Sequence, residues 1–348
     1  MQYEWAAVFR MARIRGLSMS EVSDFSVSVI LCTYNPDWRK LKATLLSAAM
    51  QEDIDFEIVL TDDGSGEDHF REAAALLDSR GFSDYRIVKN KTNVGTVRNL
   101  LGAARQARGE YIAAISPGDM LFDGHVLKCL YDFAKARDAE VCFCDAVYYE
   151  PGEGVHPVGG FPAAPQYPQL FADNAPLKLQ QTAFIWGNYV LGATLFMKRE
   201  NAVRYYELAS RGAKYIEDAF SLMYMTLAGI RIYHCPMKGI WYEYGTGVST
   251  SRDSAAFARM KTDMDNSFRL LSDYRPYCPA LAARCRIRFL RNPVLRIGYL
   301  LFRHPLVSLR LLGIFTMKKS ILDPAGVCTA WPEKLLEVFQ DPDPKETQ

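Results

Sequence analysis

Two stretches decide the fold class: residues 27–35 read VSVILCTYN and residues 57–65 read EIVLTDDGS. Each begins with a continuous apolar run, which is typical of a strand buried on both faces of a parallel sheet. Each run ends in small polar residues, which favour a turn. Between them, residues 38–50 repeat apolar side chains at helical spacing. The sequence therefore predicts a strand–helix–strand unit.

The same alternation continues to residue 147. It predicts further strands at 85–88, 111–115 and 141–147, and helices at 67–77, 96–107 and 125–136, with Thr96 as a helix cap. Strands that alternate with helices form a mostly parallel sheet. Because ligands bind at the carboxyl ends of such strands, we expect the loops after Cys32, Leu60, Val88 and Ile115 to converge on one site.

The pattern changes in the second half of the chain. Residues 150–176 are rich in Pro, Gly and Ala and predict a loop or lid. Regular structure resumes at 181–197, followed by helices near 201–208 and 217–228 and a strand at 231–235. Residues 241–250 combine aromatics, glycines and hydroxyls, which predicts a flexible loop, and helices are expected from residue 253 onward.

The composition argues against several classes of protein. The 348 residues carry a net charge of +1, so no global field favours nucleic acid. The eight cysteines show no zinc-site spacing and several lie in apolar runs, which predicts buried free thiols in a reducing compartment. No secretory signal and no run of about 18 apolar residues is visible. We therefore expect a cytoplasmic protein.

The first two loops offer hydrogen-bonding groups. Thr33, Tyr34 and Asn35 follow the first strand, and Asp62 and Asp63 follow the second. Adjacent carboxylates repel each other and add nothing to folding alone, whereas they can accept hydrogen bonds from a base or a ribose. The alternative is that one of them only caps the next helix.

The next two loops add a cation and a carboxylate. Gly95 allows a tight turn into a helix whose first turn carries Arg98. A helix start together with a guanidinium suits a base or a pyrophosphate. The alternative is that Arg98 pairs with a surface acid. Asp119 ends the SPGD stretch at 116–119. Mg²⁺ and Mn²⁺ are bound by one or two carboxylates plus substrate phosphates, but Pro-Gly-Asp is equally a common turn.

In their order, these loops resemble the inverting family 2 glycosyltransferases. The resemblance runs through the two opening stretches, NVG at 93–95 with Arg98 and Asn99, and ARGEYI at 107–112. It covers residues 26–125 well and 181–250 more loosely. It implies an α/β fold of the GT-A type: a Rossmann-like, mostly parallel mixed sheet with helices on both faces, followed by a helical C-terminal region.

The resemblance also implies site residues. The nucleotide of a sugar donor, most simply a UDP-sugar, would contact Thr33, Tyr34, Asn35, Asp62, Asp63, Gly95, Arg98 and Gly118. Asp119 falls at the last position of the family's DXD motif and would hold Mn²⁺ or Mg²⁺. The family usually has an earlier acid, where this chain has Ser116, Pro117 and Gly118.

The second half of the chain contains a candidate catalytic base. YIEDAF at 215–220 resembles the family's Glu-Asp motif, whose Asp, here Asp218, takes the proton of the acceptor hydroxyl. The alternative is that acids in a first helical turn only favour the helix dipole. Glu217 and Trp186 are expected on the acceptor side, where Trp186 would either stack on a sugar ring or pack in the core.

The resemblance and the charge pattern together predict the domain organisation. It comprises an N-terminal extension at 1–24, a catalytic domain at 25–252 with a nucleotide-binding half (25–125) and an acceptor-side half (126–252), and a helical basic region at 253–348. Residues 284–319 hold nine Lys or Arg and no Asp or Glu, interleaved with apolar residues. This favours contact with an anionic membrane surface, or packing on the body with Arg toward solvent.

We therefore expect an enzyme that moves a hexose or N-acetylhexosamine to a glycan hydroxyl, on a lipid-linked acceptor in surface-polysaccharide synthesis, at the inner face of the cell membrane. One alternative is a sugar-nucleotide binder without catalysis. Another is a nucleotidyltransferase, which needs a Gly-rich loop with a basic residue after the first strand; residues 33–36 provide none.

Overall fold

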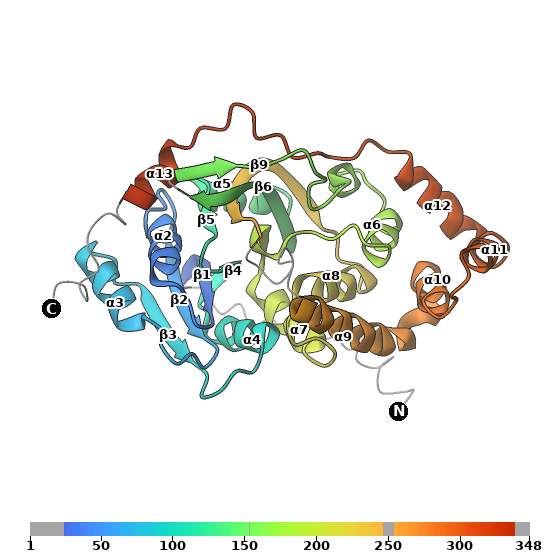
Figure 1. Ribbon diagram of the computed structural model, residues 1–348, viewed down its shortest axis with the longest axis horizontal. Coiled ribbons are helices and arrows are strands. Elements are labelled where there is room, and N and C mark those ends of the chain that lie inside the picture. The colour runs from blue at the N-terminus through green and yellow to red at the C-terminus, as the bar shows by residue number, and fades with distance from the viewer. Residues whose placement is uncertain (1–23, 153, 246–253, 338–348) are drawn as a thin grey trace.

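One mixed sheet organises the molecule (Figure 1). The computed structural model describes residues 24–152, 154–245 and 254–337, and the nine strands in them follow the order β3-β2-β1-β4-β8-β6-β9-β5, with β7 paired to β6. The strands are β1 Phe25–Thr33, β2 Phe56–Asp62, β3 Tyr85–Lys89, β4 Gly109–Ile115, β5 Met120–Leu121, β6 Val141–Gly152, β7 Gly154–Pro157, β8 Leu195–Lys198 and β9 Tyr233–Glu243.

Helices cover both faces of the sheet, as expected for a GT-A type α/β fold. In chain order they are α2 Trp38–Ala49, α3 Phe70–Ser79, α4 Thr96–Gln106, α5 Val126–Ala136, α6 Leu177–Ile185, α7 Arg199–Ala209, α8 Asp218–Leu227, α9 Ser254–Leu271, α10 Pro279–Ile287, α11 Pro293–Arg303, α12 Pro305–Phe315 and α13 Ala330–Glu337. Short 3₁₀ turns occur at Pro168–Phe171, Gly192–Thr194 and Ser272–Tyr277. Every strand and helix predicted up to residue 147 is present.

The parallel half of the sheet places the predicted loops at one edge. β1 pairs in parallel with β2 and β4, and β2 with β3, with Thr33 opposite Asp62 at the strand ends. Alternate residues of β1 face opposite layers: Leu31 packs with α2, α3 and α5, and Ile30 packs with α4 and α7. Burial on both faces explains the unbroken apolar runs in the sequence.

Three local predictions are wrong. β9 continues through Glu243, so residues 241–243 are strand and not a flexible loop, and residues 246–250 lie outside the described part of the chain. β6 and β7 form a hairpin inside the predicted lid, because Val155 is buried in an apolar cluster with Trp241. Thr96 does not cap α4: the cap position is Gly95, without a side-chain bond.

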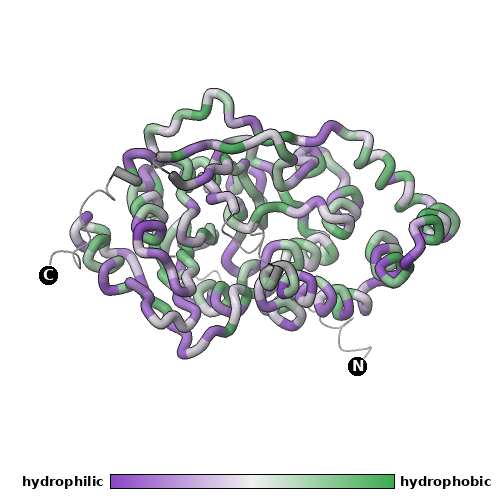
Figure 2. Tube along the Cα trace, viewed as in Figure 1, coloured by the Kyte–Doolittle hydropathy of each residue, from purple (hydrophilic) through white to green (hydrophobic). Residues whose placement is uncertain are grey.

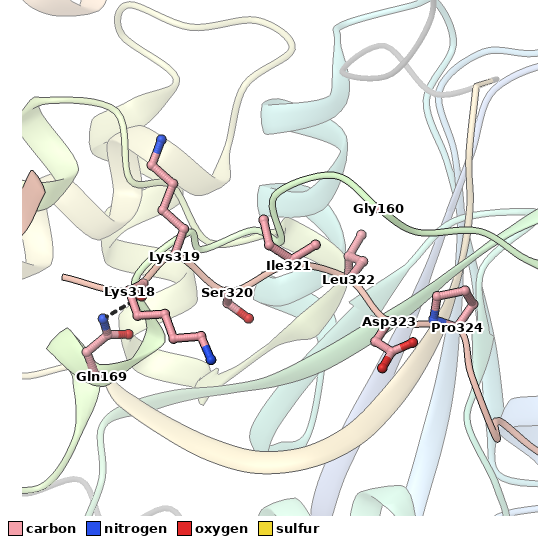
Figure 3. A pocket seen from close by; sticks show the side chains of 9 residues that line it. All are labelled: Gly160, Gln169, Lys318, Lys319, Ser320, Ile321, Leu322, Asp323 and Pro324. Carbon is pink, nitrogen blue, oxygen red and sulfur yellow. Dashed lines mark hydrogen bonds between the residues drawn. The ribbon is translucent and has the colours of Figure 1, made fainter. Parts of the chain in front are cut away.

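The C-terminal helices extend the molecule at the end opposite α3 and then return (Figure 1). After α12, residues 318–324 run against residues 159–166, with Leu322 donating its N–H to Phe161 O at 3.0 Å and accepting from Gly160 at 2.9 Å. A pocket of about 790 Å³ lies along this segment (Figure 3). α13 then packs beside α2, where the indole of Trp331 donates to Leu121 O.

Two further findings concern the whole described chain. All eight cysteines are free thiols, and five of them are buried. No single helix in the described ranges is long and apolar enough to cross a membrane, whereas α11 and α12 meet these criteria as a pair that bends by 115° at the break between them. The predicted extension at 1–24 lies outside the described residues, except for Asp24.

Candidate active site

The first two loops are joined through Asp62. Thr33 Oγ1 donates to Asp62 Oδ1 at 3.0 Å, and the N–H of Ser65 donates to Asp62 Oδ2 at 2.7 Å. Asn35 closes the arrangement, since its N–H donates to Ser65 Oγ at 2.7 Å. Tyr34 leaves 54% of its surface exposed above this network. The structure therefore brings these sequence-predicted residues together, and their contact with a nucleotide stays a prediction.

Asp63 has a different set of partners. Its Oδ1 accepts from Val94 N–H at 2.8 Å, and its Oδ2 accepts from Gly95 N–H at 2.8 Å. Neither Asp62 nor Asp63 caps α3, because the N–H of Phe70 at the start of that helix bonds to Asp68. Asp63 therefore fixes the loop that leads into α4.

Gly95 is required by a close approach as well as by its φ of +93°. A Cβ at this position would collide with the backbone carbonyl and side chain of Lys214. Arg98, three residues on, is exposed and lines a pocket of about 690 Å³ with Asn93, Lys214 and neighbouring residues of α9. The structure thus places Arg98 beside the loop that Asp63 holds.

Glu217 and Asp218 form a close carboxyl pair at the start of α8. The Asp218 carboxylate accepts a hydrogen bond from Ala219 N–H at 2.6 Å and another from the backbone at Gly192. These bonds lower the pKa of Asp218, but burial has the larger effect and raises it to about 6. Burial, and then the charge of Asp218, raise the pKa of Glu217 to about 8. The backbone bonds stabilise the ionised form of Asp218 and so favour Asp218 as the carboxylate of the pair.

Cys32 shows that the carboxyl pair lies near the strand ends. Burial raises the pKa of this thiol, at the end of β1, to about 12, and the next contribution comes from the charge of Glu217. Asp63 and Asp62 contribute in the same direction. Charges act on one group in this way only over short distances. The two halves of the predicted site are therefore brought together around the carboxyl end of β1.

Asp119 has the surroundings of a cation ligand. It is 8% exposed, and its carboxylate accepts hydrogen bonds from the backbone at Glu243 and Ser116. Burial, with a smaller contribution from the charge of Glu243, nevertheless raises the pKa of Asp119 to about 7. A buried carboxylate gains most from a nearby positive charge, and carboxylate oxygen is the ligand that Mg²⁺ and Mn²⁺ prefer. The residues present therefore fit a hard divalent cation.

Glu243 is the residue that the sequence analysis missed. It is buried, and its carboxylate fills the space where a Cβ on Gly118 would lie. Lys40 Nζ lies 2.5 Å from Glu243 Oε1. The structure thus explains the glycine at 118 through Glu243, whereas phosphate contact at Gly118 stays a prediction. The one available signal was an acid placed at the end of an aromatic strand.

Trp186 is mostly enclosed. It packs against the apolar core, and the Arg284 guanidinium lies 5.4 Å from its ring centroid. Its indole N–H is buried and has no hydrogen-bond partner among the described residues. These contacts favour the packing alternative over an open sugar platform, and the acceptor role of Trp186 stays a prediction.

A second cluster of possible ligands lies away from Asp119. Glu67, His69 and Glu72 bring their ligand atoms within 4.8 Å of one another at the start of α3. Glu67 is exposed, and exposed acids gather in this way without an ion. The cluster does not alter the assignment of Asp119.

Comparisons with known proteins agree with the fold. The crystal structure of S. aureus TarS is 20% identical over 71% of this chain and 39% of that chain, with a TM-score of 0.47. S. aureus TarS 1-349 in complex with UDP-GlcNAc is 18% identical over 69% of this chain and 66% of that one, with a TM-score of 0.50. TarS 1-349 alone is 16% identical over 83% and 78%, with a TM-score of 0.51.

The chain thus spans well under half of the first TarS structure, and at these identities the two later matches show the fold alone. No curated protein matches the sequence. The model of Glycosyl transferase family 2 matches residues 28–192, a range that includes all four predicted strand-end loops. Residues 28–192 therefore match the Glycosyl transferase family 2 model, and the described sheet and helices have the GT-A fold.

Proposed function

We propose that this protein is an inverting glycosyltransferase that moves a hexose or N-acetylhexosamine from a UDP-sugar to a glycan hydroxyl. The observation that carries the proposal is the carboxyl pair at the start of α8. Asp218 is the more acidic member, and Glu217 acts electrostatically on Cys32 at the end of β1. In this position Asp218 would act as a base beside the edge of the sheet where nucleotides bind in such folds.

Asp218 would act on the acceptor. Its carboxylate accepts the proton of the acceptor hydroxyl, and the oxygen then attacks C1 of the sugar from the side opposite the diphosphate. The bond between C1 and the diphosphate oxygen breaks, UDP leaves with the electron pair, and the configuration at C1 inverts. The backbone bonds at Ala219 and Gly192 hold the base in position.

Asp119 would hold Mn²⁺ or Mg²⁺. A divalent cation there offsets the charge that develops on the departing diphosphate. The loops of Thr33, Asn35 and Asp62 would hold the nucleoside, with Arg98 beside the base or the diphosphate.

UDP-GlcNAc is the first donor to test, because TarS 1-349 was crystallised with it. The experiment is a UDP-release assay with a panel of UDP-sugars and glycan acceptors, in Mn²⁺ and in chelator, with Asp218→Asn as the inactive control. We expect acceptor-dependent UDP release that needs Asp218. Tight UDP binding without release from any donor would instead identify a sugar-nucleotide binder.

The acceptor is proposed to be lipid-linked, because α11 and α12 are rich in exposed apolar residues. The trace of these two helices is coloured largely as hydrophobic (Figure 2). Phe302 is 91% exposed and Val294 is 74% exposed. α12 buries Val307, Leu311 and Ile314, so one face of this helix packs on the rest of the protein. α11 buries none of its residues. Both helices lie in the segment 284–319, which holds nine Lys or Arg and no Asp or Glu, and apolar groups among basic residues suit an anionic bilayer. We propose that this surface rests on the inner face of the cell membrane during surface-polysaccharide synthesis.

A further inference from the structure

Glu243 and Gly118 face each other across two strands. β5 pairs antiparallel with β9, with Met120 opposite Trp241, so the turn before β5 lies beside the end of β9. The backbone of Glu243 donates a hydrogen bond to the Asp119 carboxylate, and the Glu243 side chain occupies the space left by Gly118. The carboxylates of Asp119, in the turn before β5, and of Glu243, at the end of β9, are therefore close to each other.

Lys40 reaches the same point from α2. Its ammonium lies 2.5 Å from Glu243 Oε1. Thr44, one helical turn further along, accepts the N–H of Gly118 at 3.1 Å and so holds the turn before Asp119 against α2. The Lys40 side chain is 34% exposed, whereas that of Glu243 is 4% exposed. The flexible Lys40 side chain can therefore rotate its ammonium group into solvent, while the Glu243 carboxylate stays in place.

We propose that Glu243 is a second carboxylate ligand of the cation site, and that Lys40 occupies the site until a divalent cation displaces it. This inference rests on the proposed function, because it concerns the cation of the same reaction. Ser116, Pro117 and Gly118 leave Asp119 without an acid on its own loop. Glu243 supplies that acid from β9, and hard cations take oxygen ligands from whatever elements converge. With no cation bound, the buried Glu243 carboxylate has the Lys40 ammonium as its partner of opposite charge.

The proposal predicts opposite effects for the two members of one ion pair. The measurement is Mn²⁺ affinity of the full chain with saturating UDP, by electron paramagnetic resonance of free Mn²⁺. Glu243→Gln should weaken Mn²⁺ binding at least about tenfold, because a charged ligand is lost. Lys40→Met should tighten it about tenfold, because the competing ammonium is lost.

Matched controls come from another ion pair. Lys135 Nζ lies 2.9 Å from Glu110 Oε1 at the surface, and Lys135→Met and Glu110→Gln should leave Mn²⁺ affinity unchanged. Thermal unfolding gives a second readout. Lys40→Met leaves the Glu243 charge buried without its partner, so its melting temperature should fall without Mn²⁺ and rise more than that of the wild type when Mn²⁺ is added.

Unchanged or weaker Mn²⁺ binding by Lys40→Met would overturn the proposal, as would wild-type affinity in a folded Glu243→Gln protein. The proposed function fails separately. If the wild type binds no Mn²⁺ but still transfers sugar in chelator, only this inference is lost. If the opposite shifts appear but no UDP-sugar is turned over, the cation site stands and the proposed function does not.

Discussion

The Asp63 carboxylate at the carboxyl end of the β2 strand accepts a hydrogen bond of 2.8 Å from the backbone N–H of Gly95, directly before α4. Its other oxygen accepts from Val94. Removing the acceptor leaves these N–H groups without a partner in a buried position, so Asp63→Ala should lower the free energy of unfolding by about 1–3 kcal/mol, measured by urea denaturation.

Asp63→Asn is the matched control, because its amide keeps one oxygen acceptor and should cost less. A stability equal to the wild type for Asp63→Ala, together with lost UDP binding, would contradict the structural role and assign Asp63 to the nucleotide.

Replacing Gly95 or Gly102 by alanine should have opposite effects on the free energy of unfolding. Gly95 has a φ of +93° and no room beside Lys214, whereas Gly102 lies inside α4 with open space around its Cβ position. Gly95→Ala should lower the free energy of unfolding by at least about 1 kcal/mol because of strain. Gly102→Ala should raise it by about 0.5–1 kcal/mol. Thermal or urea unfolding of both variants decides the matter, and equal effects of the same sign would contradict the described loop.

The pH dependence of transfer should follow Asp218. Burial raises its pKa to about 6, and only the ionised form can accept a proton. The kcat at saturating donor should therefore fall as the pH drops below about 6, whereas a solvent-exposed Asp would keep activity to about pH 4. Circular dichroism at each pH checks that the fold persists. A kcat that is constant down to pH 4.5 would argue against Asp218 as the base.

Membrane contact should depend on the exposed face of α11. Leu295→Ser and Phe302→Ser together should sharply reduce flotation of the protein with vesicles rich in phosphatidylglycerol, since each exposed apolar side chain contributes to insertion. Tyr277→Ser is the control, because Tyr277 is also an exposed aromatic (84%) but lies outside the basic segment. Binding should be weak to phosphatidylcholine vesicles and fall with salt. Equal binding by the double variant would contradict the proposed surface.

The sequence predicted the parallel half of the fold because its central strands β1, β2 and β4 are largely buried on both faces. Such strands, including the run that contains Ile30 and Leu31, read as unbroken apolar stretches. The β6–β7 hairpin escaped prediction because β7 buries one residue, Val155, and lies in a stretch rich in turn-forming residues. Glu243 was placed in a flexible loop because residues 241–250 combine aromatics, glycines and hydroxyls. Its partner, Lys40, is 203 residues away and leaves no local signal.

The side-chain contacts of the candidate site could not be predicted from the sequence either. Motif order predicted site roles for Asp62, Asp63, Asp119 and Asp218, but not what each carboxylate contacts. The resemblance already favoured Asp218 over Glu217, whereas the role of Asp63 in holding Gly95 needed the loop geometry. Long-range hydrogen bonds and desolvation depend on the folded chain, and they leave no local pattern in the sequence.

The most direct test of the account compares turnover with donor binding in Asp218→Asn. Amide nitrogen and oxygen keep the size of the side chain but cannot take a proton, so kcat for sugar transfer should fall on the order of 10²-fold or more while the Kd for UDP stays near the wild-type value. Near-normal turnover in the folded variant would contradict the account, because no base would then be needed at the start of α8.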